Sequence, residues 1–192
     1  MSTHVLVPLK RLDRAKSRLT ASLSPAERAE LMRTLLDGVL EAVRSASVAK
    51  ITLVTSEPIV DLIGVEIWHD RDLPWNVALE EAMREVVSEE MATVISADLP
   101  TLVSGEVRAL IAATPAHGIA IARAEDGGTN AVSMRPPALL RTQFGEPSSA
   151  GVHARSAQTR GLEHVIVDLP GLAFDVDTPE DLERIPQRRE KK

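Results

Sequence analysis

The stretch Thr93-Val94-Ile95-Ser96-Ala97-Asp98-Leu99-Pro100 decides the fold. It is a short apolar run, rich in β-branched residues, that ends on a carboxylate and stops at a proline, and this pattern is typical of a buried strand. In an open α/β sheet, ligands bind just beyond the carboxyl ends of such strands. Asp98 is therefore placed to hold a divalent cation against phosphate oxygens, although a strand-end aspartate can equally cap the next helix.

A second acidic stretch, residues 173–182, favours the metal interpretation. It reads Ala-Phe-Asp-Val-Asp-Thr-Pro-Glu-Asp-Leu, and in an extended segment Asp175 and Asp177 share one face. Two acidic strand ends in one small domain predict a shared divalent-metal site at Asp98, Asp175 and Asp177.

Strand-like and helix-like segments alternate on both sides of these stretches. Strands are expected at residues 5–8, 51–55, 65–68, 93–97, 118–122, 131–134 and 164–167. The alternation predicts an α/β fold with a mostly parallel mixed sheet, helices on both faces and an antiparallel insertion at 127–134. The 192 residues suit a single domain, expected at 1–186, followed by a charged, frayed tail at 187–192.

Helix signals between the strands are uneven in strength. Ser24, Pro25 and Glu27 form a capping-box pattern that begins a helix running to about Val43. Further helices are expected at 75–87, at 103–112, twice within 136–161, and after Thr178. For the helix at 75–87 the expected inner side holds Val77, Ala78, Met83 and Val87.

Composition excludes several classes of protein. The net charge of −6 and the 2% aromatic content disfavour nucleic-acid binding. The absence of cysteine excludes disulfides and thiolate metal sites, and fits a cytoplasmic protein. No apolar run approaches the ~20 residues of a membrane span, and Met1–His4 has no signal-peptide pattern, so no membrane partner is expected.

A basic loop follows the first expected strand. Its cations could neutralise a nucleoside triphosphate during phosphoryl transfer, or could simply form a solvated charged face. The chain has neither a P-loop motif nor G-x-G-x-x-G, so phosphates would be held by side-chain charge and metal. The candidate residues are Lys10, Arg11, Arg14, Lys16 and Arg18, with Lys10, Lys16 and Arg18 favoured.

Two glycine-containing turns are candidate ligand sites. In Gly127-Gly128-Thr129-Asn130 the paired glycines could aim consecutive N–H groups at an anion, or form an ordinary hairpin turn. Phe144-Gly145, followed by Ser148 and Ser149, could form an anion site at a helix N-terminus, or the serines could only cap that helix.

The remaining polar and aromatic candidates carry weaker signals. Asn76 could touch a base, whereas Trp68 and Trp75 are expected to be packing residues. The histidines lack metal-ligand spacing and are expected on the surface or in turns; they are His4, His69, His117, His153 and His164.

Several of these motifs, in order along the chain, match a known family. They are Val7-Pro8-Leu9-Lys10, Ala15-Lys16-Ser17-Arg18-Leu19, Leu23–Arg28, Asn76–Leu79, Ser96–Pro100, Gly127–Ala131, Phe144-Gly145 with Ser148, and Asp175–Leu182. On these residues the chain resembles the 2-phospho-L-lactate / phosphoenolpyruvate guanylyltransferase family of deazaflavin coenzyme biosynthesis. The resemblance covers nearly the whole chain.

The resemblance implies a nucleotide-diphospho-sugar-transferase-like fold and a Mg²⁺-dependent reaction. A guanylyl group would pass from GTP to the phosphate of a small phosphorylated acid, with release of diphosphate. Thr129, Gly145 and Ser148 would contact the acid, although Ser149 can replace Ser148 in this role. The same resemblance implies metal carboxylates at Asp98, Asp175 and Asp177 and phosphate contacts at Lys10 and Lys16.

Some alternatives stay open from sequence. The acceptor can be phosphoenolpyruvate, 2-phospho-L-lactate or 3-phosphoglycerate, since no side chain can be assigned to the difference. Another nucleotidyltransferase of this fold, acting on a sugar phosphate or a molybdopterin, is a second candidate, and a non-catalytic nucleotide-binding domain is a third. A homodimer is also possible.

Overall fold

The computed structural model describes residues 2–12, 16–59, 62–146 and 148–185. Of the sequence-based expectations, the cation Arg14, the domain end at residue 186 and the charged tail at 187–192 lie outside these ranges.

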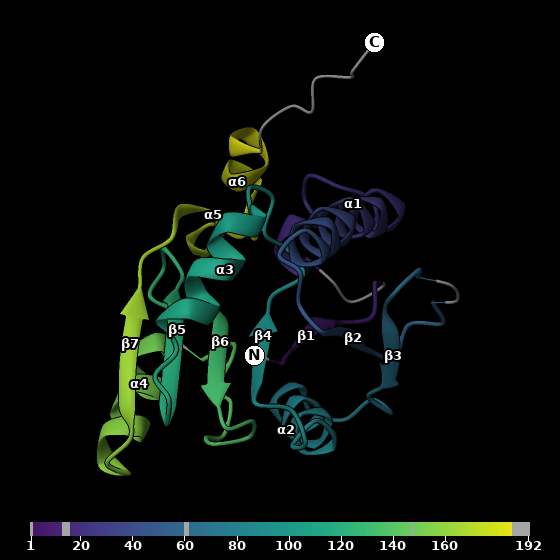
Figure 1. The fold of residues 1–192 in the computed structure, drawn as a ribbon. Coiled ribbons are helices and arrows are strands. Elements are labelled where there is room, and N and C mark those ends of the chain that lie inside the picture. The colour runs from purple at the N-terminus through teal and green to yellow at the C-terminus, as the bar shows by residue number, and fades with distance from the viewer. Residues whose placement is uncertain (1, 13–15, 60–61, 147, 186–192) are drawn as a thin grey trace.

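The described residues form one seven-stranded sheet in the order β3-β2-β1-β4-β6-β5-β7 (Figure 1). Neighbouring strands are parallel from β3 to β4 and between β5 and β7, whereas β6 is antiparallel to both of its neighbours. This confirms the predicted mixed sheet and its antiparallel insertion. The strands are β1 (Thr3–Leu9), β2 (Lys50–Thr55), β3 (Glu66–His69), β4 (Met91–Ile95), β5 (Gly118–Arg123), β6 (Thr129–Arg135) and β7 (Glu163–Val167).

Helices cover both faces of the sheet, and α1 and α2 lie on opposite sides of β1 (Figure 1). Val5 and Val7 of β1 pack into the core beneath α1 and α3, and Leu6 packs into the core beneath α2 and α4. This alternation follows from the two-residue period of a strand. The helices are η1 (Ser17–Leu19, a 3₁₀ turn), α1 (Pro25–Arg44), α2 (Trp75–Glu85), α3 (Ser104–Ala113), α4 (Ser149–Thr159), α5 (Pro170–Ala173) and α6 (Pro179–Arg184).

Local capping explains where two of the helices begin. Ser24 accepts a hydrogen bond from the backbone N–H of Glu27, whose side chain accepts one from the Ser24 N–H, as predicted. Thr178 and Asp181 form the same reciprocal pair at the start of α6. This second capping box holds the chain just after Asp177 in a defined direction.

Several details differ from expectation. Val77 was expected to face inward but is 41% exposed, because the helical period places Leu79, Ala82 and Met83 on the buried stripe with Ala78. Val87 is 59% exposed because α2 ends at Glu85, two residues before the predicted end, and Val87 lies in the turn that follows. Residues 136–146 form turns and irregular backbone in place of the first helix expected within 136–161. The short helix α5 was not predicted.

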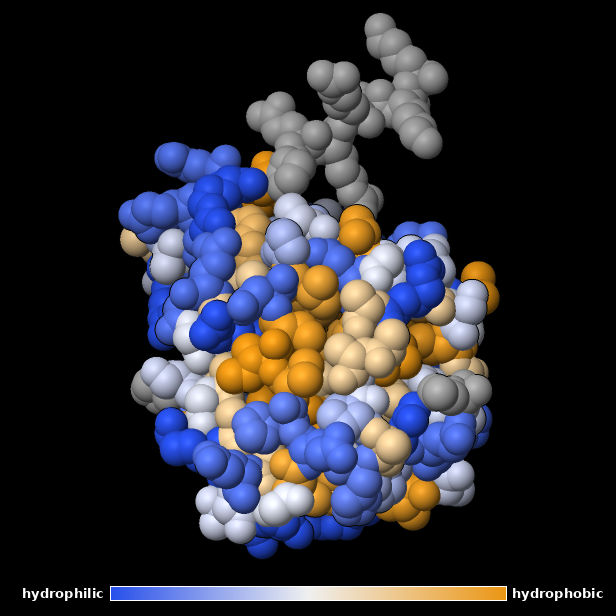
Figure 2. All heavy atoms as spheres, turned by 60° about the vertical axis from the view of Figure 1, so that its left-hand side comes forward, coloured by the Kyte–Doolittle hydropathy of each residue, from blue (hydrophilic) through white to orange (hydrophobic). Residues whose placement is uncertain are grey.

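One face of the molecule exposes the edge strand β7. Figure 2 turns this side forward and shows apolar side chains gathered among polar ones. Val165 and Ile166 of β7 are 38% and 41% exposed.

None of the helices in the described part of the chain is long and apolar enough to cross a membrane. The homodimer stays a prediction.

Candidate functional site

A cleft of about 550 Å³ opens beyond the carboxyl ends of β1 and β4. It lies where the open-sheet rule places ligands. The three favoured cations, the three predicted metal carboxylates and the predicted substrate contacts line this cleft, except Asn76. Phe144 and Ser149 of the predicted anion site also line it. The sequence did not mark the other lining residues as site residues: Ser17, Trp75, Ser96, Ala124, Asp126 and Glu146.

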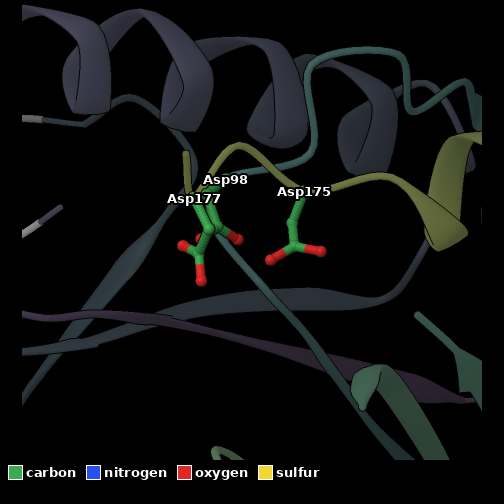
Figure 3. A group of neighbouring side chains, drawn as sticks. All are labelled: Asp98, Asp175 and Asp177. Atoms are coloured by element: carbon green, nitrogen blue, oxygen red, sulfur yellow. The ribbon is translucent and has the colours of Figure 1, made fainter. Parts of the chain in front are cut away.

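Three carboxylates converge on one wall of the cleft. Asp98 follows β4, and Asp175 and Asp177 lie in the segment between α5 and α6, so residues about 80 positions apart meet in space (Figure 3). One oxygen from each carboxylate lies within 4.8 Å of the others. The backbone N–H of Val176 donates to the Asp98 carbonyl (3.3 Å), which ties the two segments together. Oxygen ligands in this number suit a hard cation such as Mg²⁺.

Asp175 is half-buried in this wall. Burial raises the pKa of its carboxyl to about 6, and the nearby negative charge of Asp98 acts in the same direction. The Asn130 side-chain amide donates to Asp175 Oδ1 (3.0 Å) and opposes the shift. Asn130 is itself only 5% exposed, and its Nδ2 also donates to the Ala173 carbonyl (3.4 Å).

Lys16 balances the charge of the acidic wall. Its ammonium contacts Asp98 and lies 3.0 Å from Asp177 Oδ1, with only 5% of the side chain exposed. Burial alone would lower the pKa of Lys16, but the carboxylates of Asp98 and Asp177 hold it above its ordinary value. Lys16 has a φ of 52°, so the loop turns sharply to deliver this side chain.

The other two predicted cations are more exposed. Arg18 donates to Asp177 Oδ2 (3.1 Å), and 71% of its side chain is exposed. Lys10 Nζ lies 4.9 Å from the centre of the Trp75 ring, in cation–π geometry. Trp75, expected to be a packing residue, thus lines the cleft and holds a cation over it.

The opposite wall carries hydroxyl groups. Thr129, at the start of β6, lies beside Ser149, at the start of α4, and Ser149 Oγ donates to Thr129 Oγ1 (2.9 Å). Ser148 is the N-cap of α4 with a φ of 55°, and its side chain makes no capping hydrogen bond. Ser149 is fully buried and already engaged, so of the two serines Ser148 is the one placed to meet a ligand.

The Gly127-Gly128 turn does not aim its N–H groups as expected. The Gly127 N–H donates to the Ala124 carbonyl (3.0 Å), and the Gly128 N–H donates to Asp126 Oδ1 (2.7 Å). A Cβ at Gly128 would lie 2.8 Å from that same oxygen, so a larger residue would displace the Asp126 carboxylate from this hydrogen bond. The anion-nest interpretation is therefore wrong: the aspartate satisfies the donor that a ligand would need.

Asn76 holds a loop and does not line the cleft. Its Nδ2 donates to the Phe144 carbonyl (3.1 Å), and its Oδ1 accepts from the Phe144 N–H (2.9 Å). Both polar atoms of the amide are thus occupied by the backbone next to Gly145. The structure corrects the expected base contact to a role in loop positioning. Gly145 follows with a φ of 80°, a conformation that glycine adopts without strain.

His153 and His4 are buried, contrary to the expectation of surface histidines. His153 is fully buried, and its ring packs edge-on against Phe144 with centroids 5.7 Å apart. Burial lowers the pKa of His153 to about 4, so the ring is neutral near pH 7. No sequence spacing marks it, because its partners come from β6 and the loop before α4. His4, 2% exposed, lies in β1 and contacts Thr52 Oγ1 (2.7 Å).

The two walls together form a site for a polyanion. Carboxylates that can hold a cation, three basic side chains and a hydroxyl wall enclose one space. Phosphoryl transfer needs charge neutralisation and positioning more than covalent chemistry, and these groups can supply both.

The comparisons with known proteins agree with this geometry. The family described as "Guanylyl transferase CofC like" matches residues 3–189. A phosphoenolpyruvate guanylyltransferase of Sphaerobacter thermophilus is 40% identical over 96% of this chain and 93% of its own length. A 2-phospho-L-lactate guanylyltransferase of Methanoregula boonei is 31% identical over 95% of this chain and 81% of its own length.

A solved structure supports the fold independently. A candidate nucleotide-diphospho-sugar transferase from Desulfovibrio desulfuricans G20 superposes with a TM-score of 0.78 at 19% identity, over 95% of this chain and 85% of that one. The chain belongs to the guanylyl transferase family described as CofC like.

Proposed function

We propose that the protein is a guanylyltransferase that joins GMP from GTP to the phosphate of a small phosphorylated acid and releases diphosphate, in deazaflavin coenzyme biosynthesis. The observation that carries the proposal is the convergence of Asp98, Asp175 and Asp177 beside Lys16 in one cleft. The names of the family and of its relatives supply the guanylyl group and the acid.

The donor set of the acidic wall fits Mg²⁺. Asp98, Asp175 and Asp177 offer three hard oxygen ligands close together, which is the ligand type that Mg²⁺ prefers. We propose that these three residues hold it. When bound, the ion would neutralise phosphate charge and act as a Lewis acid toward the α-phosphoryl group.

The residues of the chain would then do three things. The basic side chains of Lys10, Lys16 and Arg18 bind phosphate oxygens and stabilise the charge that develops on them. The hydroxyls of Thr129 and Ser148 orient the phosphorylated acid. An oxygen of its phosphate attacks the α-phosphorus of GTP, the bond between the α-phosphorus and the bridging oxygen breaks, and diphosphate leaves with the electron pair. No general base is needed, because the attacking phosphate oxygen is already anionic near pH 7.

Phosphoenolpyruvate is the acceptor we propose first. The relative with 40% identity carries that acid in its name, whereas the relative named for 2-phospho-L-lactate is 31% identical. The two acids differ around a single carbon, so the same wall can present the same hydroxyls to either phosphate.

A substrate panel tests the proposal. Each of phosphoenolpyruvate, 2-phospho-L-lactate and 3-phosphoglycerate is combined with GTP, ATP, CTP or UTP and Mg²⁺, and diphosphate release is measured with the adduct identified by mass spectrometry. The expected result is a guanylylated acid from GTP and phosphoenolpyruvate, and none after chelation of Mg²⁺. The same assay with a sugar phosphate in place of the acid is the comparison. Diphosphate release only with the sugar phosphate, or GTP binding without turnover of any acid, would overturn the proposal.

A further inference from the structure

His153 makes directional contacts that fix the position of its ring proton. The backbone N–H of Gln143 donates to His153 Nε2 (3.0 Å). A backbone N–H can only donate, so Nε2 must be the unprotonated nitrogen of the ring. In a neutral imidazole the proton is then on Nδ1, and the low pKa of this buried ring, about 4, keeps it neutral near pH 7.

This tautomer sets the direction of the next hydrogen bond. His153 Nδ1 lies 3.1 Å from Thr129 Oγ1, so Nδ1–H donates and the threonine hydroxyl accepts, with the Ser149 backbone as a further hydrogen-bonding neighbour of the ring. Ser149 Oγ donates to the same oxygen (2.9 Å). A hydroxyl oxygen has two lone pairs and one proton. Both lone pairs of Thr129 are therefore occupied from behind, and its proton is left to donate elsewhere.

Thr129 borders the cleft, so its remaining hydroxyl proton can donate to a ligand bound there. Thr129 is 6% exposed and lines the cleft, as does the fully buried Ser149, whereas the fully buried His153 lies behind them. A hydroxyl that can only donate selects an acceptor, such as a phosphate or carboxylate oxygen, and disfavours a ligand N–H or O–H.

We propose that His153 is a positioning residue that, with Ser149, locks the Thr129 hydroxyl as a hydrogen-bond donor toward an anionic oxygen of the phosphorylated acid. The identity of the acid rests on the proposed function; the polarity of the hydroxyl does not. The same ring also accepts from Gln143, so one side chain joins α4, β6 and the loop that carries Gly145.

The tautomer can be read without turnover. In protein labelled with ¹⁵N-histidine, long-range ¹H–¹⁵N correlation spectra near pH 7 assign the protonated ring nitrogen of His153, using a His153→Phe sample to identify the signal. The expected result is a neutral ring protonated at Nδ1. A ring protonated at Nε2, or a charged ring, would overturn the proposal. Failure of every acid in the substrate panel would overturn the proposed function and leave this readout standing.

Steady-state kinetics separate positioning from a general loss of structure. His153→Phe retains the ring packing against Phe144 and removes both hydrogen bonds. We expect it to raise the KM for the acid about tenfold, with the KM for GTP changed less than about twofold. His153→Asn can still donate from the position near Nδ1, and we expect it to recover part of the loss. The matched control is His117→Phe, at an exposed turn before β5, with unchanged kinetics.

A double-mutant cycle completes the test. Thr129→Val removes the donor, so His153 should have no hydroxyl left to orient in that background. We expect Thr129→Val combined with His153→Phe to be no worse than Thr129→Val alone. Multiplicative effects, or equal increases in KM for both substrates, would overturn the proposal. If His153→Phe does not fold, the wild-type spectra and His153→Asn still decide it.

Discussion

The two walls of the cleft hold their polar groups in opposite ways. On the acidic wall, Asp98 and Asp177 are partly exposed, carry like charges and are balanced by the Lys16 ammonium. On the hydroxyl wall, Ser149 and His153 are fully buried and neutral, and each hydrogen bond has a defined donor and acceptor. The acidic wall acts on a ligand through charge, and the hydroxyl wall acts through hydrogen bonds of fixed direction.

The difference follows from how the two kinds of interaction depend on distance. Charges act over several ångströms and respond to counter-ions and salt, so the acidic wall tolerates partial exposure and small shifts of its side chains. A hydrogen bond weakens steeply when its angle or length changes, so the hydroxyl wall needs a packed neighbourhood. Changes in the acidic wall should therefore alter kcat most, and changes in the hydroxyl wall should alter the KM for the acid most.

Removing one charge from the acidic wall should have the largest effect. In Asp98→Asn a proposed cation ligand and a partner of Lys16 are lost together. We expect kcat with GTP, phosphoenolpyruvate and Mg²⁺ to fall about 10²–10³-fold, or about 3–4 kcal/mol of transition-state stabilisation. Asp168→Asn, at an exposed carboxylate paired with Arg123, is the control and should keep its rate. Near-normal turnover of Asp98→Asn would remove the acidic wall from the mechanism.

The pH dependence of the free energy of unfolding should show that His153, in the hydroxyl wall, is buried as a neutral ring. The pKa of His153 is about 4 in the folded protein against an ordinary value of 6.5, so the unfolded chain binds the extra proton first as pH falls. The contribution of the neutral ring to the free energy of unfolding is fully present above pH 6.5. It is lost as the pH falls to about 4, and the loss amounts to about 3 kcal/mol. Urea unfolding at pH 7 and at pH 4 measures it.

The control for this pH effect is the same pair of measurements on His153→Phe. The variant lacks the titrating group, so its free energy of unfolding should fall less between the two pH values. His4, whose pKa is also lowered by burial, titrates in both proteins and cancels in the difference. Equal falls in the two proteins would show that His153 is not buried as a neutral ring.

Releasing the loop behind the hydroxyl wall should have a smaller effect. Asn76→Ala removes two hydrogen bonds to Phe144, worth about 1–3 kcal/mol locally. We expect faster hydrogen exchange at 143–146 and a KM for the acid raised several-fold (about 3–10) with kcat nearly kept. Asn76→Asp keeps the acceptor and loses the donor, so it should fall between the wild type and Asn76→Ala. A change confined to the KM for GTP would restore the base contact for Asn76.

Arg18 should matter least among the charged residues. Its side chain is 71% exposed, and its ion pair with Asp177 is worth at most about 1 kcal/mol in water. We expect Arg18→Ala to lower kcat/KM less than about fivefold, and the difference to shrink at high salt because exposed charges are screened. Initial rates at low and high ionic strength measure this. A loss as large as that of Asp98→Asn would place Arg18 on the reacting phosphates.

Elements whose residues are neighbours along the chain could be predicted well. The strand before Asp98, the capping box at Ser24 and the turn at Gly127 each depend on a few adjacent residues. Their side-chain period and capping chemistry are local properties, so composition and spacing carry them. The buried faces of the helices were predicted less well. Val77 is apolar and was expected to be buried, yet the neighbouring alanines and Leu79 form the face of α2 that packs on the core.

Hydrogen-bond partners across the fold could not be predicted in this way. Asp126 occupies the Gly128 N–H, Phe144 occupies the Asn76 amide, and Ser149 is committed to Thr129. Each pairing uses up a donor or acceptor that the sequence alone left free for a ligand. The burial of His153 likewise depends on three segments that meet only in the folded chain.

By itself, the sequence determined the order of the strands along the chain, the acidic strand ends and the family, because these rest on local pattern and on motifs in series. Only the tertiary structure decided which polar atoms still face the cleft. The physical reason is that a hydrogen-bonding group is free or satisfied according to what packs against it, and packing partners come from anywhere in the chain.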